Sequence, residues 1–327
     1  MSISDKNKKF SKLAALFVLL LFAIWFLSTK DMIATESHIF EVKKGSSMGS
    51  IAKELSNKGL IKSELFFTSF SKFLNANKKL KSGYYEILPG TSVWTFIDKI
   101  STGSVLSTKV TLIEGKTIKF YFNQLTNDPS IKPSGSLKEV MTSIGINEPY
   151  DGWFFPETYS FNYGESLENV LKRAHQELMK NLMVLWDQRD KGLPLKSPYE
   201  AIILASLIEN ETALDEEKSL IAGVFIRRLN EGMRLQTDPT VIYALGDAYS
   251  PPLKKSDLRI NSLYNTYRNK GLPPGAISSV GYQSLFAALH PSSNTDLYFV
   301  SKKDGSHAFA PNYEKHKENI KKYLNNN

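Results

Sequence analysis

One carboxylate stands where an acid for bond cleavage is expected, at the end of a long apolar run. Residues 201–208 are apolar apart from one serine, and residues 209–212, Glu-Asn-Glu-Thr, follow directly. A carboxyl group held where water is scarce is disfavoured as an anion, so it keeps a proton that it can donate near neutral pH. Glycoside cleavage needs such a donor. We therefore take Glu209 as the candidate catalytic residue.

The same pattern has a structural interpretation, in which Glu209 is simply the place where a core helix reaches the surface. The second carboxylate, Glu211, lies roughly 200° around a helix from Glu209, so the two cannot share a face. We expect Glu211 to support the site from the substrate side rather than to share the chemistry.

Local signals place this segment on a buried helix. Ser197 is a good N-cap, Pro198 suits the first helical position, and Glu200 completes a Ser-x-x-Glu capping box. The run that follows is apolar on all sides, which is typical of a helix inside the core. The helix is thus expected to carry Glu209 out of the interior.

The first 30 residues differ from the rest of the chain. Four lysines, ending at Lys12, precede an uncharged run that extends from Leu13 to Leu27. With its edges this run approaches the roughly 20 residues that a membrane span needs. The basic flank predicts a cytoplasmic tail at residues 1–12, an uncleaved anchor at residues 13–29 and an exported remainder. A cleavable signal peptide is the competing interpretation.

Composition narrows the classes of function. The 327 residues suffice for two domains, and the formal net charge is +8. The cationic residues are spread out, which disfavours nucleic-acid binding but suits an anionic membrane or cell-wall polymer. The absence of cysteine excludes disulfides and thiol catalysis. His290, His307 and His316 lie far apart in sequence, so we expect no metal site, and no cofactor is indicated.

Residues 38–104 are expected to form a small α+β module. A strand at Phe40 and Val42, a helix from residue 48 to Gly59, a second helix capped by Ser63, a strand at 83–88 and a helix at 92–100 are indicated by apolar spacing. The second helix is expected to bury Phe66, Phe70 and Phe73 or Leu74. This order of elements resembles a lysin-motif (LysM) glycan-binding module, and a spacer domain without a ligand is the alternative.

Residues 105–327 are expected to form a mixed α+β catalytic domain, which makes the fold class of the whole α+β. Within it, residues 151–159 form an aromatic segment that includes Trp153 and Glu157. Aromatic faces bury the apolar C–H surface of sugars, so the segment suits a sugar platform, but aromatic clusters also build cores. Ser166 then begins a long amphipathic helix that serves as scaffold.

Three polar or rigid loops follow the buried helix. They are the segment Met233–Thr240, with Arg234, Gln236 and Asp238, the segment Asn265–Tyr267, and the proline-rich turn Gly271–Ile277. Loops of this kind beside a carboxylate at the end of a buried helix indicate a cleft.

Several segments, in this order, are those of a known family. They are Gly152–Pro156, Ala205–Thr212, Gly232–Tyr243, Tyr264–Tyr267, Gly271–Ile277 and His290–Pro291. On them the exported chain resembles the YceG-like family of endolytic murein transglycosylases. The resemblance implies an enzyme anchored in the inner membrane that cleaves nascent peptidoglycan glycan strands internally, at MurNAc–GlcNAc bonds, and terminates their elongation. It implies Glu209 as the catalytic glutamate and penicillin-binding proteins and other cell-wall synthases as partners.

The chemistry that the resemblance implies requires only one carboxyl group. A lytic transglycosylase uses the C6 hydroxyl of muramic acid as an internal nucleophile, with the high effective molarity of a tethered group. Glu209 would protonate the glycosidic oxygen and then accept the hydroxyl proton as a 1,6-anhydro end forms. Gln236, Asp238 and Asn265 are candidates for orienting the substrate, and Arg234 for facing its carboxylate. Asp238 equally suits a helix cap before Pro239.

Two alternatives stay open at this point. A lysozyme-like hydrolase would leave reducing muramic ends, whereas a lyase leaves anhydro ends. A membrane-tethered glycan-binding scaffold would cleave nothing, and its properties would not depend on Glu209.

Overall fold

The computed structural model describes residues 3–324, with side chains from residue 14 on except that of residue 28. The chain divides into two compact units, Met1–Thr108 with Ser160–Gly164, and Lys109–Tyr159 with Glu165–Asn327. Both units combine helices with short two-stranded sheets, so the predicted α+β class is confirmed.

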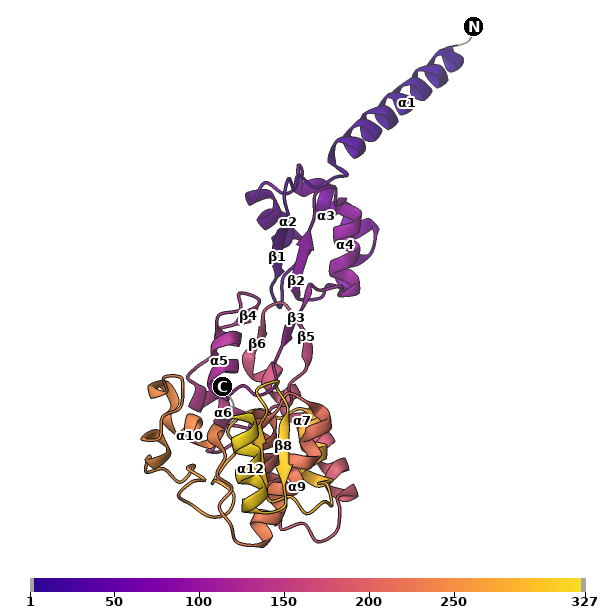
Figure 1. Ribbon diagram of the computed structural model, residues 1–327. Coiled ribbons are helices and arrows are strands. Elements are labelled where there is room, and N and C mark those ends of the chain that lie inside the picture. The colour runs from indigo at the N-terminus through magenta and orange to yellow at the C-terminus, as the bar shows by residue number, and fades with distance from the viewer. Residues whose placement is uncertain (1–2, 325–327) are drawn as a thin grey trace. The chain divides into compact units, whose positions relative to one another are not determined.

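The first unit surrounds one antiparallel strand pair with helices (Figure 1). Phe40 lies opposite Tyr85 in that pair, and both side chains are buried. The order strand, helix, helix, strand agrees with the sequence pattern, while glycan binding by this module stays a prediction. Its elements are α1 (Ile3–Thr29), β1 (His38–Val42), α2 (Met48–Asn57), α3 (Glu64–Phe73), η1 (Ala76–Lys78), β2 (Gly83–Ile87) and α4 (Val93–Thr102).

Capping and apolar spacing explain why these helices form. Ser63 accepts a hydrogen bond from the backbone of Phe66 as predicted, and Ser92 begins α4 in the same way. Of the two alternatives for the end of α3, Leu74 packs against the core, whereas Phe73 is 82% exposed. Phe67, which the spacing did not single out, is fully buried.

The predicted anchor at residues 13–29 lies within α1. Across residues 3–324, none of the helices combines the length and the apolarity that a membrane crossing requires.

The second unit is mainly helical and carries the candidate catalytic residues. Two strands, β3 (Ser107–Thr111) and β5 (Thr158–Asn162), are divided between the two units. The other elements of the second unit are α5 (Ile118–Thr126), β4 (Ile131–Lys132), α6 (Leu137–Ser143), β6 (Glu165–Ser166), α7 (Leu167–Gln188), α8 (Pro198–Glu211), α9 (Asp215–Asn230), α10 (Asp238–Leu245), η2 (Gly246–Ala248), η3 (Asp257–Arg259), α11 (Tyr282–Leu289), β7 (Tyr298–Ser301), β8 (His307–Ala310) and α12 (Tyr313–Tyr323).

The buried helix is α8, and it lies among α7, α9 and α11. All eight residues from 201 to 208 are buried, as the apolar run predicted. Ser197 caps the helix, but Glu200 accepts from the backbone N–H of Lys196 instead of closing the capping box. Burial of this helix stabilises the unit at about 25 cal/mol for each Å² of apolar surface removed from water.

The packing around α8 is tight enough to require a glycine. Gly152 has φ +86°, and a Cβ there would lie 2.5 Å from the Cβ of Ala276 and 2.8 Å from Ile202. The segment 151–155 can therefore pass close to α8 only because residue 152 has no side chain.

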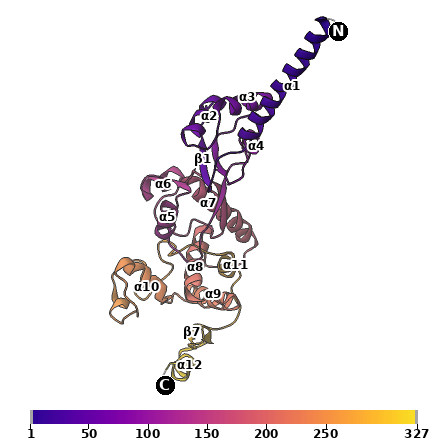
Figure 2. The same ribbon diagram turned by 90° about the horizontal axis from the view of Figure 1, so that it is seen from above.

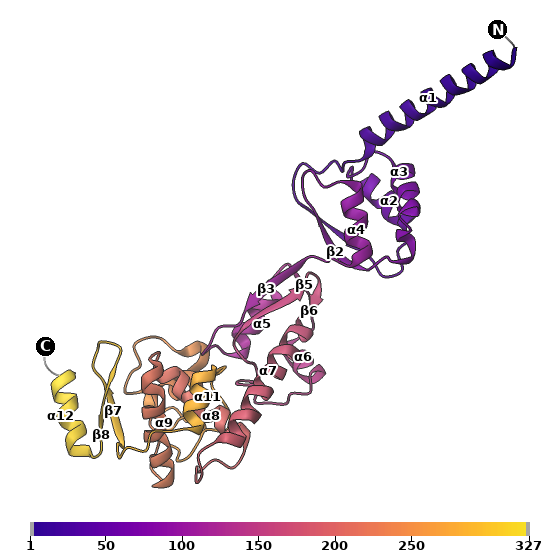
Figure 3. The same ribbon diagram turned by 90° about the vertical axis from the view of Figure 1, so that its right-hand side faces the viewer.

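The C-terminal elements form a separate layer beside α9. β7 and β8 pair antiparallel, α12 packs on both strands, and β7 contacts α9. Figures 2 and 3 show these elements gathered beyond α9, and Figure 2 shows α10 to one side of α8 and α9. The end of α8 thus lies between polar loops and a C-terminal layer.

Candidate active site

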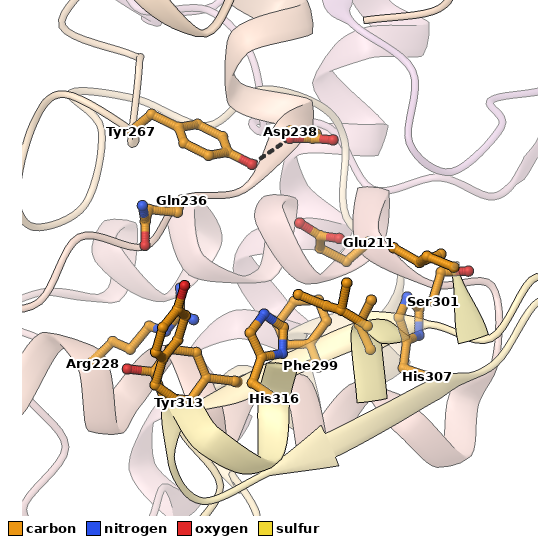
Figure 4. A pocket seen from close by; sticks show the side chains of 14 residues that line it. Glu211, Arg228, Gln236, Asp238, Tyr267, Phe299, Ser301, His307, Tyr313 and His316 are labelled. Atoms are coloured by element: carbon orange, nitrogen blue, oxygen red, sulfur yellow. Dashed lines mark hydrogen bonds between the residues drawn. The ribbon is translucent and has the colours of Figure 1, made fainter. Parts of the chain in front are cut away.

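A cavity of about 600 Å³ opens beside the last turn of α8 (Figure 4). One wall comes from α8 and the loops after α9, and the other comes from β7, β8 and α12. Its polar and aromatic lining resembles that of sites that bind sugars. The lining residues are Glu211, Arg228, Gln236, Asp238, Tyr267, Tyr298, Phe299, Val300, Ser301, His307, Tyr313, His316, Ile320 and Leu324.

Glu211, the last residue of α8, is the carboxylate that the helix delivers to this cavity. Burial raises the pKa of its side chain to about 7, and the charge of Asp238 acts in the same direction. A hydrogen bond from the hydroxyl of Thr237 opposes this shift, as do the positive charges of His307 and Arg228. A carboxyl with this pKa holds a proton at the pH where a general acid must work.

Two predicted substrate-binding residues share the cavity with Glu211. Gln236 has φ +53°, a left-handed conformation that is costly for a residue with a side chain. Its backbone N–H donates to the carbonyl of Thr266 at 3.2 Å. The hydroxyl of Tyr267 donates to Oδ1 of Asp238 at 2.5 Å, the contact drawn in Figure 4. One backbone hydrogen bond and one side-chain hydrogen bond thus connect this loop to residues 266 and 267.

Asp238 begins α10 but does not cap it. The N-cap is Thr237, which makes no side-chain capping bond. The carboxylate of Asp238 is instead turned toward Tyr267 and the cavity, so the helix-cap alternative is wrong for this residue.

Arg228 lines the cavity and is held in place by two backbone carbonyls. Its Nε donates to the carbonyl of Leu297 and its Nη1 to that of Leu235, each at 2.7 Å. The guanidinium also lies 5.2 Å from the ring centre of Tyr298. These contacts join α9 to both walls, and the cation partly balances the acidic groups in the cavity.

A histidine and a buried carboxylate form a second polar pair at the cavity. Glu217 accepts from the backbone N–H of His307 at 2.8 Å, and its other oxygen lies 2.7 Å from Nδ1 of the same ring. The two side chains are 9% and 11% exposed, respectively. The ring is thereby held in one orientation at the cavity wall.

Glu209 lies outside this cavity. Its Oε2 accepts from the backbone N–H of Gly281 at 2.9 Å, and its Oε1 is 3.7 Å from Nζ of Lys218. Both side chains are nearly excluded from solvent, at 7% for Glu209 and 5% for Lys218. The helical offset that separates Glu209 from Glu211 therefore places the predicted acid in a buried ion pair on another side of α8.

Glu114 is a second carboxylate near Glu209 that the sequence pattern did not single out. Its pKa is raised by burial and by the charge of Glu209, while Lys218 opposes the shift. A Cβ on Gly281 would lie 2.1 Å from Oε1 of Glu114, so both carboxylates contact the backbone of this one glycine. Glu114 lies in the short turn between β3 and α5.

Asn265 and Arg234 take other places than the cavity wall. Asn265 is fully buried, and its amide donates to the carbonyls of Leu258 and Ile260 at 3.0 and 2.9 Å. Its Oδ1 accepts from the backbone of Tyr267, which aligns the loop that carries this tyrosine. The side chain of Arg234 is exposed and is not part of the lining. Their direct contact with substrate stays a prediction.

The aromatic segment at residues 151–159 mostly contributes to the core. Phe154, Phe155 and Tyr159 are buried. Trp153 is partly buried and stacks on Tyr199, with ring centres 4.6 Å apart and planes within 5°. Glu157 is exposed, and neither Trp153 nor Glu157 lines the cavity beside Glu211. A sugar platform at this segment stays a prediction.

His307, His316 and Arg228 are among the cavity residues that the sequence pattern did not predict. The spacing of the histidines along the chain is unfavourable for a metal site, and that was the only role it suggested for them. The fold brings both to one cavity, but across residues 3–324 it forms no group of three or more His, Asp or Glu side chains suited to hold a metal ion. Sequence separation alone could not show that they line the same cavity.

The comparison with protein families covers nearly the whole chain. The model of the YceG-like family matches residues 40–322, which include every element from α2 to β8 and the cavity residues up to Ile320. The chain belongs to the YceG-like family. The resemblance predicted from the motifs is thereby confirmed.

Relatives within the YceG-like family carry a functional name. The endolytic murein transglycosylase of Bacillus subtilis strain 168 is 31% identical over 309 residues, which cover 86% of this chain and 84% of that protein. The endolytic murein transglycosylase of Streptococcus pneumoniae R6 is 28% identical over 323 residues, covering 87% of this chain and 58% of that protein.

A solved structure in the YceG-like family supports the fold. The crystal structure of a putative YceG-like protein from Listeria monocytogenes superposes with a TM-score of 0.57 at 29% identity. The match covers 87% of this chain and 99% of that one. The mixed α+β architecture is therefore that of the family.

Proposed function

We propose that this chain is an endolytic lytic transglycosylase of peptidoglycan and that Glu211 is its proton donor. Family membership and the names of the relatives support the activity and the substrate class. The observation that carries the assignment of the acid is its carboxyl group, which has a pKa of about 7 and lines a cavity of about 600 Å³. That volume lies in the usual range for a ligand site.

The acid step follows from the protonation state of Glu211. Near neutral pH part of the population holds the proton, which Glu211 donates to the glycosidic oxygen as the C1–O4 bond breaks. The C6 hydroxyl of the same muramic residue attacks C1, and a 1,6-anhydro ring closes. The tethered hydroxyl replaces water as nucleophile, so no second carboxylate has to activate a water molecule.

The groups around Glu211 suit an amide-bearing sugar. Gln236 offers both a donor and an acceptor, and Asp238 offers an acceptor that Tyr267 already orients. Rings of Tyr298 and Tyr313, which line the cavity from β7 and α12, supply apolar faces. We assign Gln236 and Asp238 to hold the N-acetyl and hydroxyl groups of the substrate.

Glu209 is less suited to the acid step than Glu211. The side chain of Glu209 lies outside the cavity and is enclosed by Lys218 and the backbone N–H of Gly281, whereas Glu211 lines the cavity. Both contacts favour a side chain that supports the packing of α8 on α9. The resemblance gave the catalytic role to Glu209. We assign that role to Glu211 instead.

A matched pair of substitutions tests this assignment. Glu211→Gln keeps the shape of the side chain but removes the proton that it donates, so we expect the rate of glycan cleavage to fall by about 10²–10⁴-fold. Glu209→Gln keeps the acceptor for Gly281 and is expected to retain cleavage while lowering thermal stability. The measurement is the cleavage rate of purified glycan strands at a temperature where both variants are folded. If Glu209→Gln cleaved more slowly than Glu211→Gln, Glu209 would be the proton donor instead.

The products separate the proposed activity from its two alternatives. We expect mass spectrometry of digested strands to show anhydromuramic ends formed from internal bonds. Strands that carry only reducing muramic ends would indicate a hydrolase, and uncut strands bound by folded protein would indicate a glycan-binding scaffold.

We also propose that the enzyme acts at the inner membrane, with its N-terminal residues in the cytoplasm and the catalytic unit outside. The support is the lysine-rich start of the sequence and the apolar side chains along α1, of which Leu16, Phe17 and Leu19 are 60–70% exposed. Such a surface is costly in water and favourable in lipid. Termination of strand elongation and association with penicillin-binding proteins stay predictions.

A further inference from the structure

The pair formed by His307 and Glu217 has no role in the acid step just described. Two hydrogen bonds join them, one from the backbone N–H and one at Nδ1 of the ring, at 2.8 and 2.7 Å. Both side chains are about nine-tenths buried. His307 nevertheless lines the cavity, and its positive form is close enough to lower the pKa of Glu211.

The hydrogen bonds determine which ring nitrogen carries the proton. An ionised carboxylate is only an acceptor, so Nδ1 of the neutral ring must donate to Glu217. The lone pair is then on Nε2, the nitrogen on the other side of the ring. A carboxylate that orients a histidine in this way also stabilises the ring when it becomes charged.

We infer that His307 is the base that removes the proton from the attacking C6 hydroxyl, and that Glu217 is the residue that positions it. The inference rests on the proposed function. Glu211 would then act as an acid only, instead of serving in turn as acid and base. The two groups come from different walls of the cavity, Glu211 from α8 and His307 from β8, as Figure 4 shows.

The two-residue step balances without any further reactant. Glu211 gives its proton to O4 of the leaving sugar as the C1–O4 bond breaks. The C6 oxygen forms a bond to C1 and loses its proton to Nε2 of His307. The imidazolium then returns a proton to the Glu211 carboxylate, directly or through water, and both residues regain their starting forms.

Removing the ring gives the first test. We expect His307→Ala to lower the turnover number by about 10²–10⁴-fold, the range for loss of a positioned base, with a smaller change in KM. Added imidazole should restore part of the rate, because a free base can enter the space that the ring leaves. Restored activity of this kind is not expected from a residue that only supports the fold.

A change of the partner gives a second test that keeps the ring. In Glu217→Gln the amide oxygen can still accept the backbone N–H of His307, so the amide NH₂ faces Nδ1. That arrangement moves the ring proton to Nε2 and removes the base. We expect a loss of turnover similar to that of His307→Ala, and no restoration by imidazole because the ring still fills the space.

The control is a second histidine and carboxylate pair outside the cavity. Nδ1 of His290 lies 3.1 Å from Asp190, and His290→Ala should leave turnover within about twofold and show no response to imidazole. A His307→Ala enzyme with turnover near that of the wild type would overturn the inference, and so would an active Glu217→Gln enzyme. Failure of the wild type to form anhydro ends would overturn the proposed function instead.

Discussion

At the scale of residues, two carboxylates two positions apart have opposite surroundings. Glu211 faces a cavity with a carboxylate, an arginine and a histidine nearby, and burial raises its pKa to about 7. Glu209 contacts Lys218 and a backbone N–H donor. The sequence shows both residues at the end of the same helix, and only their neighbours in space separate an acid from one half of an ion pair.

The raised pKa of Glu211 predicts a dependence of stability on pH. Between about pH 4.5 and pH 7 the folded chain keeps a proton that the unfolded chain has lost. The contribution of this proton to stability is therefore complete below about pH 4.5 and is lost as the pH rises through about 7.

Thermal unfolding of the wild type and of Glu211→Gln between pH 4.5 and pH 8 measures this contribution. We expect the melting temperature of the wild type to fall relative to that of the variant as the pH rises. The exposed Glu216→Gln variant serves as control and should follow the wild type. A difference between wild type and Glu211→Gln that does not change with pH would contradict a raised pKa.

At the scale of elements, the site depends on how α8 packs against α9. The buried side chain of Lys218 contacts Glu209 at 3.7 Å and Asp215 at 2.9 Å, which joins the end of one helix to the start of the next. The preceding residue, Glu217, turns to His307 and the C-terminal layer. The first turn of α9 thus contacts Glu209 of α8 through Lys218 and contacts His307 of β8 through Glu217.

Breaking this ion pair is expected to be costly. Lys218→Met leaves the carboxylate of Glu209 buried without its cation, which typically costs about 3–5 kcal/mol in free energy of unfolding. The double variant Glu209→Gln with Lys218→Met should recover most of that loss. Denaturant unfolding of the two single variants and the double variant measures the coupling. Additive losses would show that the two charges do not depend on each other.

At the scale of the whole molecule, two separate clusters of buried side chains stabilise the two units. One cluster is built around β1, β2 and α2–α4, and the other around α7, α8, α9 and α11. The exposed apolar side chains of α1 belong to the first unit, and the cavity with Glu211 belongs to the second. The proposed attachment to a membrane and the proposed cleavage site therefore belong to different parts of the chain.

Removal of residues 1–30 tests that separation. The shortened chain keeps both clusters from Met32 onward, so we expect it to fold and to cleave dispersed glycan strands at a rate within about threefold of the full chain. In cell fractionation the full chain should be recovered with membranes, and the shortened chain in the soluble fraction. Equal distribution of the two chains would contradict the proposed attachment.

The sequence by itself determined the helices, because caps and apolar spacing are local properties. Ser63, Ser92 and Ser197 begin helices where the pattern placed them, and residues 201–208 are all buried. It also determined the family, since the motifs occur in the family's order over most of the chain. It brought Glu211, Gln236 and Asp238 to attention as residues with suitable chemistry.

Only the tertiary structure decided which of these residues meet. Glu217 and His307 are 90 positions apart and share two hydrogen bonds, and no periodicity within one helix or strand predicts such a contact. The same holds for Glu211, whose pKa depends on burial by residues from other elements. Charge and solvation act through space, so the pKa of a carboxyl group depends on the residues that the fold places around it.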